Sequence, residues 1–352
     1  MADKLKVGIV GCGAVANMRH IPAFMRLENQ VVLQAVCDKN ESLARATANK
    51  YHIPESYSDL SQMLSEEKLD IVDICTPPKV HRSVAIEAMG HRCHVLLEKP
   101  MAPTTEECDE MIKASKESGV KLGIIHNQLF SPPMLAARKL VREGAIGKFT
   151  GMRILSSDPR DEMIMRKDYW IHKLPGGMIG ETGPHLIYKA IAFIGSVESV
   201  NVIARNSFDH PWTPFDEYRI ELEGQEANCS ILVSYSSNRR ASTIDLLGTE
   251  GALHVDLVSM LLTRYDNLKS MNPIMLALPP LKMSTQVIGG IVRNAFSVLK
   301  DKGKFFGHDV IIGRFVDSIL NNSQPPVTAE EGRETTRVME MIVNKLQRKY
   351  GN

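Results

Sequence analysis

The first 125 residues alternate between short apolar runs and longer segments with helical periodicity. Five runs have the length of strands: Lys6–Val10, Val31–Cys37, Ile71–Cys75, His94–Leu97 and Lys121–Ile125. Unbroken apolar runs of this kind are typical of strands that helices cover on both faces. Thr104 and Glu107 form a capping box that begins one of the intervening helices. The pattern predicts an α/β fold with a doubly wound parallel sheet that ends near residue 125.

After residue 126 strand-like runs follow one another with few helices between them. These runs are Phe149–Ser156, Ser199–Ala204, Glu217–Leu222, Asn228–Tyr235, Thr243–Leu247 and Ala252–Leu257. Successive strands favour an antiparallel sheet, so we expect residues 126–352 to form a second, α+β domain. Two helices are expected to close the chain, one over Ile311–Leu320 and one after Thr328, which forms a capping box with Glu331.

Composition narrows the class of protein. The chain has 352 residues, enough for two domains, and a net charge of +1, so we expect neither nucleic acid nor an anionic membrane as the main partner. Its six cysteines form no C-x-x-C pair, which argues against disulfides and structural zinc and favours a reducing cytoplasm. No apolar stretch approaches the ~18 residues of a membrane helix. The N-terminal apolar run stops at Gly8, too early for a signal peptide.

A glycine-rich turn follows the first predicted strand. Gly11 permits a tight turn, and Gly13 lets the backbone approach a pyrophosphate. Ala16 replaces the third glycine of the G-x-G-x-x-G pattern, where helix and strand pack closely. The helix that begins over Ala14, Val15 and Ala16 presents free N–H groups to phosphates. The turn therefore predicts dinucleotide binding by a Rossmann domain over residues 1–125.

The end of the second strand bears on the choice of cofactor. Asp38 lies where a carboxylate would accept hydrogen bonds from the adenosine ribose, which favours NAD because a 2′-phosphate would be repelled. Lys39 could pair with that phosphate, so NADP stays open. Two other interpretations are a turn that merely joins strand to helix beside a solvated acid, and a flavin site.

Three further motifs stand at fixed places along the chain: Thr76-Pro77-Pro78-Lys79-Val80-His81, Glu98-Lys99-Pro100 and Gly176–His185. Together with the glycine turn and Pro325–Thr328, they resemble the glucose–fructose oxidoreductase / inositol dehydrogenase (Gfo/Idh/MocA) family, in order and spacing along nearly the whole chain. The resemblance implies a C-terminal domain built on a large, mostly antiparallel open sheet, through which members form homodimers or homotetramers. It also implies oxidation or reduction of one carbon of a sugar or cyclic polyol with NAD or NADP. The further cofactor contacts implied are Thr76, Pro77, Pro78, His81, Glu98, Lys99 and Asn127.

The same resemblance nominates catalytic residues, and their chemistry agrees. Lys99, at the end of a strand, could hold the substrate oxygen and relay its proton. Glu181 and His185 are four residues apart, and they share a face if the helix expected over Gly183–Gly195 begins slightly earlier. A carboxylate beside a histidine raises its basicity, so His185 would be the general base for alcohol oxidation. We predict no metal site, since His91 and His94 lead into a strand and lack carboxylate partners.

The chain departs from the family pattern around the substrate. Glu181 stands where the family usually has Asp, so the pocket or the contact to His185 must differ. Tyr188 replaces an acid three residues after His185, and Leu129 replaces an arginine. The candidate substrate residues are Asp158, Arg160, Trp170 and Tyr188. A surface loop accounts equally well for the first two, and a core aromatic for Trp170.

One segment is unusually apolar for a connection in this family. Residues 272–306 carry apolar side chains at helical spacing between Val287 and Leu299. The interpretation that we favour is a helix packed on the protein or on a neighbouring subunit, and the alternative is a lid over a larger substrate.

The leading hypothesis is a dehydrogenase of a sugar or cyclic polyol. An imine or double-bond reductase of the same fold is the second, and a non-catalytic NAD(P) sensor is the third.

Overall fold

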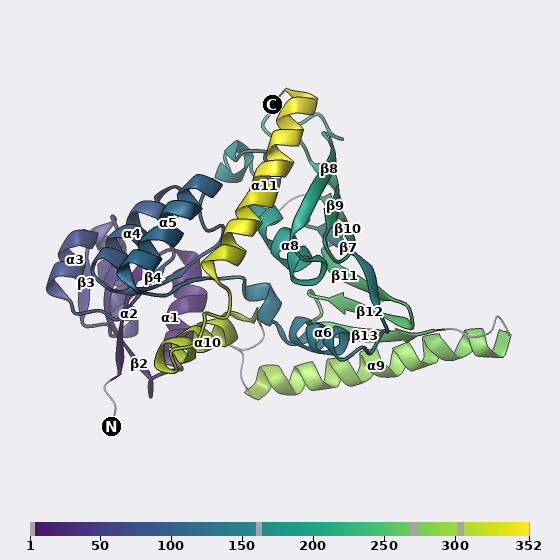
Figure 1. The fold of residues 1–352 in the computed structure, drawn as a ribbon, viewed down its shortest axis with the longest axis horizontal. Helices are drawn as coiled ribbons and strands as arrows, with labels where there is room; N and C mark the ends of the chain where they lie inside the picture. The colour runs from purple at the N-terminus through teal and green to yellow at the C-terminus, as the bar shows by residue number, and fades with distance from the viewer. Residues whose placement is uncertain (1–3, 160–163, 268–272, 301–305, 352) are drawn as a thin grey trace. The chain divides into compact units, whose positions relative to one another are not determined.

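The computed structural model describes residues 4–159, 164–267, 273–300 and 306–351. The chain divides into two compact units (Figure 1). The first comprises Met1–Phe130 and Phe306–Arg337, and the second comprises Ser131–Phe305 and Val338–Asn352.

The first unit is built on a parallel sheet, which among the described residues has six strands in the order β3-β2-β1-β4-β5-β6. The strands are β1 (Leu5–Val10), β2 (Val31–Cys37), β3 (Glu55–Tyr57), β4 (Ile71–Ile74), β5 (His94–Leu97) and β6 (Leu122–Ile124). All four residues of β4 and the last four of β1 are buried. The predicted doubly wound parallel sheet is confirmed; the three-residue edge strand β3 was not anticipated.

Helices follow the strands as the alternation predicts. They are η1 (Ala16–His20), α1 (Ile21–Met25), α2 (Glu41–Tyr51), α3 (Leu60–Glu66), η2 (Pro78–Val80), α4 (His81–Gly90), α5 (Thr105–Ser118) and η3 (Asn127–Phe130). Thr104 caps α5, because its hydroxyl accepts a hydrogen bond from the backbone N–H of Glu107 at 3.3 Å. The helix after the glycine turn contains a π-helical stretch, η1, a local widening that recurs at functional sites.

A late segment of the chain also belongs to the first unit. The helix α10 (His308–Leu320) buries Ile311, Ile312 and Phe315, and a Cβ at Gly123 of β6 would lie 2.7 Å from the Phe315 ring. Because Gly123 has no side chain, α10 can pack on the sheet. The sequence predicts one boundary near residue 125, with a last helix that packs back on the first domain as an alternative. In the structure residues 306–337 join the first unit, and α11 (Ala329–Tyr350) has residues in both units.

The second unit is built on a mostly antiparallel open sheet, whose described strands have the order β13-β12-β11-β7-β10-β9-β8. They are β7 (Phe149–Ser157), β8 (Val197–Arg205), β9 (Glu217–Gly224), β10 (Asn228–Ser234), β11 (Ala241–Gly248), β12 (Gly251–Asp256) and β13 (Leu261–Asp266). Only β7 and β10 pair in parallel within the described sheet. The expected α+β arrangement is confirmed.

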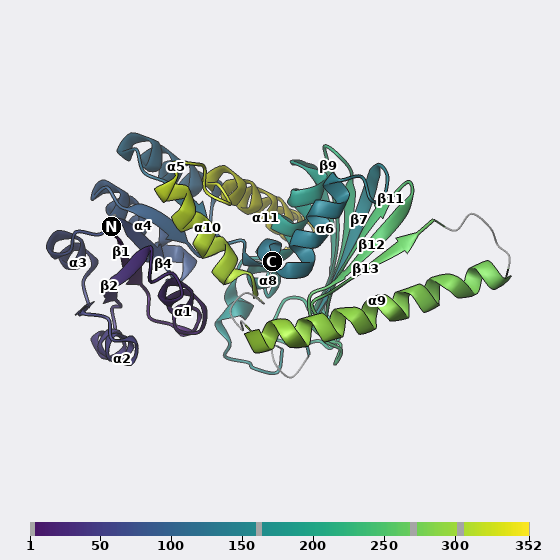
Figure 2. The ribbon, with the colours of Figure 1, turned by 90° about the horizontal axis from the view of Figure 1, so that it is seen from below.

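One face of this sheet is buried and the other is exposed. Along β8 buried and exposed residues nearly alternate, the pattern of a sheet covered on one side. The helices of the unit are α6 (Pro132–Arg142), η4 (Trp170–Lys173), α8 (Ile179–Ile194) and α9 (Pro273–Lys300). Figures 1 and 2 show α9 running beside the edge strand β13. Among the described helices, none combines the length and the hydropathy that a membrane span requires.

Candidate functional site

The glycine-rich turn has the geometry that the motif requires. Gly11 has φ +94°, and a Cβ there would lie 2.8 Å from the carbonyl carbon of Cys75. Its N–H donates to the carbonyl oxygen of Cys37 at 2.8 Å. Only glycine fits this close approach between the ends of β2 and β4. A Cβ at Gly13, by contrast, would have no described heavy atom within 4 Å. The backbone at Gly13 is therefore open to a ligand.

Asp38 braces this turn. One oxygen of its carboxylate accepts the N–H of Cys12 at 2.8 Å, and the other accepts the N–H of Asn40 at 2.9 Å. Each carboxylate oxygen can accept more than one hydrogen bond, so the ribose contact predicted from the sequence stays compatible with this bracing. The neighbouring Lys39 is exposed.

The loop after β4 holds a polar atom that lacks a partner. The hydroxyl of Thr76 is buried and makes no hydrogen bond to the described residues, which costs on the order of 1–3 kcal/mol unless a ligand or water meets it. A Cβ at Gly11 would lie 3.0 Å from the backbone nitrogen of Thr76, so this hydroxyl belongs to the same edge as the glycine turn. An unpaired hydroxyl next to the glycine turn that also carries the open Gly13 fits a dinucleotide.

His81 joins two loops of this edge. Its Nε2 lies 2.7 Å from the carbonyl oxygen of Thr76, and its Nδ1 lies 3.0 Å from that of Pro100. Pro77 occupies the N-cap position of the short helix η2, which begins at Pro78 and leads to His81. The Thr76–Pro78 loop and the Glu98–Pro100 loop are thereby held together, and His81 acts here through the backbone of both.

A buried network that the sequence did not reveal lies beneath Glu98. The ring of His20 is fully buried, with Nδ1 2.8 Å from an oxygen of Asp73 and Nε2 2.9 Å from one of Glu98. Burial opposes charge on His20, but Asp73 outweighs it and raises the pKa of His20 well above its usual value. Burial likewise works to raise the pKa of Glu98, but His20 and His308 bring it to about 2. The network is therefore an imidazolium between two carboxylates.

This network positions the backbone of Lys99. The second oxygen of Glu98 accepts the N–H of Lys99 at 3.0 Å. His308, from α10, adds a ring nitrogen 3.9 Å from the first oxygen of Glu98. His20, Glu98 and His308 lie close enough together to hold a metal ion, but both ring nitrogens of His20 already lie at hydrogen-bond distance from carboxylate oxygens. A protonated His20 therefore explains the arrangement of these side chains without a metal.

The second candidate cluster lies on α8 and includes Glu181 and His185, which are half-buried on one face. Nδ1 of His185 lies 2.8 Å from the hydroxyl of Tyr188, and the two rings meet edge-on. Tyr188 is buried, so it holds the His185 ring in one orientation. Two glycines with positive φ, Gly176 and Gly177, turn the chain into this helix.

Besides the network around His20, sequence reasoning also missed Lys189. It follows Tyr188 directly and is 1% exposed. Burial lowers its pKa from 10.5 to about 7. The signal was present in the sequence, as one lysine within the apolar run that ends α8.

The remaining candidates are placed as follows. Asp158 follows β7 and pairs with Arg240 at 3.2 Å. Arg160 lies outside the described residues, and the backbone of Trp170 begins η4. Asn127 is buried in η3, where its side-chain amide donates to the carbonyl oxygen of Phe306 at 3.2 Å.

A Rossmann sheet with an open glycine turn, joined to an open-sheet domain, defines a two-domain dinucleotide-binding oxidoreductase. The chain belongs to the Gfo/Idh/MocA oxidoreductase family. Residues 5–126 match the "Oxidoreductase family, NAD-binding Rossmann fold", and residues 134–254 match the "GFO/IDH/MocA C-terminal domain". The protein therefore binds NAD(P).

Individual relatives are distant. A D-glucoside 3-dehydrogenase of Escherichia coli is 31% identical over 57% of this chain and 57% of its own length. The scyllo-inositol 2-dehydrogenase (NADP(+)) IolW of Bacillus subtilis is 26% identical over 58% and 56%. The uncharacterized oxidoreductase YrbE of the same organism is 24% identical over 96% and 93%. The chain spans 53–64% of the length of three further curated relatives.

The fold is shared with solved structures over almost the whole chain. The WlbA dehydrogenase from Bordetella pertussis, in complex with NADH and UDP-GlcNAcA, has a TM-score of 0.78 at 21% identity, covering 99% of this chain and 98% of its own. An oxidoreductase from Agrobacterium radiobacter, in complex with NAD+, L-tartaric acid and magnesium, has a TM-score of 0.77 at 17% identity, covering 99% and 98%.

Proposed function

We propose that this protein is an NAD(P)-dependent dehydrogenase that transfers a hydride between the nicotinamide and one CH–OH carbon of a sugar, cyclic polyol or related compound. The observation that carries the proposal is the edge of the parallel sheet, where the open Gly13 and the unpaired Thr76 hydroxyl adjoin the loop of Lys99. Two of the distant relatives, a D-glucoside 3-dehydrogenase and a scyllo-inositol 2-dehydrogenase, support the substrate class.

The cofactor would be held by the glycine turn. The backbone at Gly11 and Gly13 and the N–H groups of Ala14–Ala16 receive the pyrophosphate, and Thr76–Pro78 border the nicotinamide half. Asp38 accepts the ribose hydroxyls, which favours NAD over NADP. The bound nicotinamide supplies or takes up the hydride.

Proton transfer would fall to Lys99 and His185. The ammonium of Lys99 holds the substrate oxygen and stabilises negative charge that develops on it. When Nδ1 of His185 donates to the Tyr188 oxygen, the Nε2 lone pair can accept the alcohol proton. Glu181, one turn earlier, favours the imidazolium that results.

The substrate pocket would be lined by Asp158, Arg160 and Trp170, with Tyr188 acting both on the pocket and through His185. Carboxylate and guanidinium groups suit the many hydroxyls of a sugar or polyol. We further propose a homodimer or homotetramer formed through the open sheet of the second unit.

The test is a screen for cofactor reduction with NAD+ and NADP+ across polyols, hexoses, amino sugars and uronates. We expect turnover with at least one alcohol, lost in His185→Ala and kept in His254→Ala, whose ring lies on β12 beside Asp245. Full turnover in His185→Ala would overturn the catalytic assignment. Cofactor binding without turnover of any compound would favour the sensor, and activity only on imines or double bonds would favour the reductase.

A further inference from the structure

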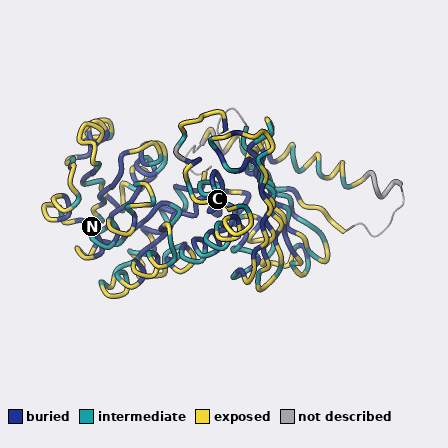
Figure 3. The backbone as a smooth tube through the Cα atoms, turned by 90° about the horizontal axis from the view of Figure 1, so that it is seen from above, coloured by how far each residue is buried: buried dark blue, intermediate teal, exposed yellow. Residues whose placement is uncertain are grey.

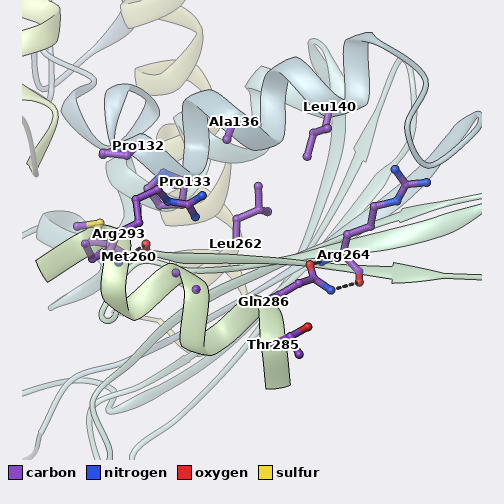
Figure 4. Close-up of a pocket in the computed structure, with 13 residues that line it drawn as sticks. Pro132, Pro133, Ala136, Leu140, Met260, Leu262, Arg264, Thr285, Gln286 and Arg293 are labelled. Atoms are coloured by element: carbon purple, nitrogen blue, oxygen red, sulfur yellow. Dashed lines mark hydrogen bonds between the residues drawn. The ribbon is translucent and has the colours of Figure 1, made fainter. Parts of the chain in front are cut away.

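The helix α9 lies on the edge of the open sheet with its polar side inward. The side-chain oxygen of Gln286 accepts the N–H of Arg264 on β13 at 2.8 Å, and its nitrogen donates to the carbonyl oxygen of the same residue at 3.1 Å (Figure 4). The side-chain nitrogen of Asn294 donates to the carbonyl oxygens of Ser259 and Met260 at 3.0 and 2.9 Å. These amides fix which face of α9 meets the protein.

A glycine strengthens this orientation. Gly290 is buried, and a Cβ there would lie 2.6 Å from a methyl carbon of Leu261 on β13. The helix can approach the strand this closely only because the side chain is missing. Rotating α9 to turn another face inward would break the four amide contacts and lose this fit.

The opposite face of α9 is apolar and exposed. Seven large side chains on it are between 50% and 82% exposed, and we call them the outer stripe: Leu278, Leu281, Ile288, Ile291, Val292, Phe296 and Leu299. At 100° per residue they fall within about 140° of the helix, on the side away from Gln286. Figure 3 shows α9 as a largely exposed element.

The length of the stripe sets it apart from scattered surface residues. With 28 residues, α9 is about 42 Å long at 1.5 Å per residue. The polar Ser284 and Thr285 interrupt the stripe between Leu281 and Ile288, and five of its seven side chains lie together from Ile288 to Leu299. An apolar face of this size is unusual on a water-facing surface and marks an interaction site. The polar side chains of α9 therefore contact the protein, and its apolar side faces outward, where a partner could bind.

The charge of the segment indicates what that partner is. Between residues 273 and 300 the sequence has three cations, Lys282, Arg293 and Lys300, and no acid; Lys302 and Lys304 follow, beside one aspartate. The whole chain carries only +1, so the rest of it is net acidic. Lys282 pairs with Asp266 on β13, and the sequence of the segment stays net positive after that acid is counted.

A cavity behind α9 also combines apolar side chains with positive charge. A space of about 580 Å³ lies between α6, β13 and α9 (Figure 4). The described residues that line it include the apolar Pro133, Leu140 and Leu262, two arginines, Arg264 and Arg293, and no acid. Arg264 also pairs with Asp266. Apolar surface beside guanidinium groups suits an amphiphile with an anionic head.

We propose that α9 docks this protein on an anionic lipid surface, lying in the plane of the interface with the outer stripe among the acyl chains. An amphipathic helix with apolar residues on one face and cations at its border is the form such docking takes. A second copy of the chain would bring two net positive segments together, since α9 has no acid and Asp266 offsets only one of its cations. Nucleic acid would leave the stripe exposed to water.

The test is flotation of the full chain with lipid vesicles. We expect the protein to float with vesicles of equal parts phosphatidylcholine and phosphatidylglycerol at least ~10-fold more than with phosphatidylcholine alone, and less as salt rises. The double variant Ile288→Glu/Phe296→Glu should lose this binding. The matched control Met25→Glu/Leu320→Glu, at side chains of α1 and α10 that are 46% and 47% exposed and lie outside both α9 and the open sheet, should keep it.

Each result has a definite meaning. Circular dichroism and thermal unfolding verify that both double variants fold. No flotation, or equal flotation with neutral and anionic vesicles, overturns the proposal. Concentration-dependent association in analytical ultracentrifugation that is lost in Ile288→Glu/Phe296→Glu, without vesicle binding, would show that a second copy covers the stripe. Flotation needs no turnover, so this result stands apart from that of the proposed dehydrogenase.

Discussion

Replacing Lys189 by methionine should raise the free energy of unfolding, and the gain should shrink as pH rises. Lys189 is almost fully buried on α8, and burial lowers its pKa from 10.5 to about 7. A base with a lowered pKa binds its proton more tightly in the unfolded chain than in the folded one. Folding therefore carries a penalty that is absent above about pH 10.5, grows as pH falls and is complete below about pH 7.

The magnitude follows from the same pKa values. A fall from 10.5 to about 7, at 1.36 kcal/mol for each pH unit, corresponds to a penalty on the order of 5 kcal/mol. Methionine has a similar length and no charge, so Lys189→Met removes the penalty while largely filling the same space. The advantage of the variant should fall by about 1.4 kcal/mol for each pH unit between about pH 7 and pH 10.5.

Urea unfolding of both proteins between about pH 6 and pH 9 measures this difference. Lys189→Arg is the control: its charge cannot be lost, so it should be less stable than the wild type, by a margin that widens as pH rises. A constant stability difference between Lys189→Met and the wild type across this range would refute the reasoning.

Three other predictions concern the candidate site. His20→Leu should lower the free energy of unfolding by about 3–5 kcal/mol, since it leaves two buried carboxylates without their imidazolium. Because the pKa of His20 is raised in the folded protein, the stability that His20 contributes is complete below about pH 6.5 and is lost as pH rises through the folded-state pKa. Urea unfolding at two pH values checks both, and a change under about 1 kcal/mol would contradict the network. Asp38→Ala should weaken NAD+ binding more than NADP+ binding in fluorescence titrations; equal weakening would exclude the ribose contact. Tyr188→Phe should lower kcat about tenfold with little change in KM, as expected for loss of one hydrogen bond to His185 worth about 1.4 kcal/mol; an unchanged kcat would separate Tyr188 from catalysis.

The local elements could be read from the sequence because their causes are local. The predicted runs agree with β1, β2, β4, β5 and β6 to within a residue or so at each end. The capping box at α11 forms in full, with the Thr328 N–H donating to Glu331 at 2.7 Å and the Glu331 N–H donating to the Thr328 hydroxyl at 3.2 Å. The turn at Gly11 is decided by steric exclusion of a Cβ, which a single letter reveals. Hydrophobic periodicity, helix caps and glycine turns depend on a few neighbouring residues, so the sequence alone predicts them.

Only part of the candidate site could be predicted from the sequence. Motifs nominated Thr76, Lys99 and His185, since each stands at the end of a strand or on a short helical repeat. They could not show that Glu98 is held by His20, 78 residues away. Nor could they show that Tyr188 orients His185, because that contact depends on which way a buried ring points.

The α/β and α+β halves, the glycine turn and the family resemblance could be predicted before folding was considered, since each depends on local periodicity or on residue types at fixed spacing. The packing of α10 on the first sheet and the link from His20 to two carboxylates required the folded molecule. So did the orientation of α9, whose apolar side faces outward. On the net charge of the whole chain we expected no membrane partner, although residues 273–300 by themselves carry three cations and no acid. Long-range packing selects among faces that the linear pattern leaves equivalent, and a charge summed over the whole chain hides in which segment it lies.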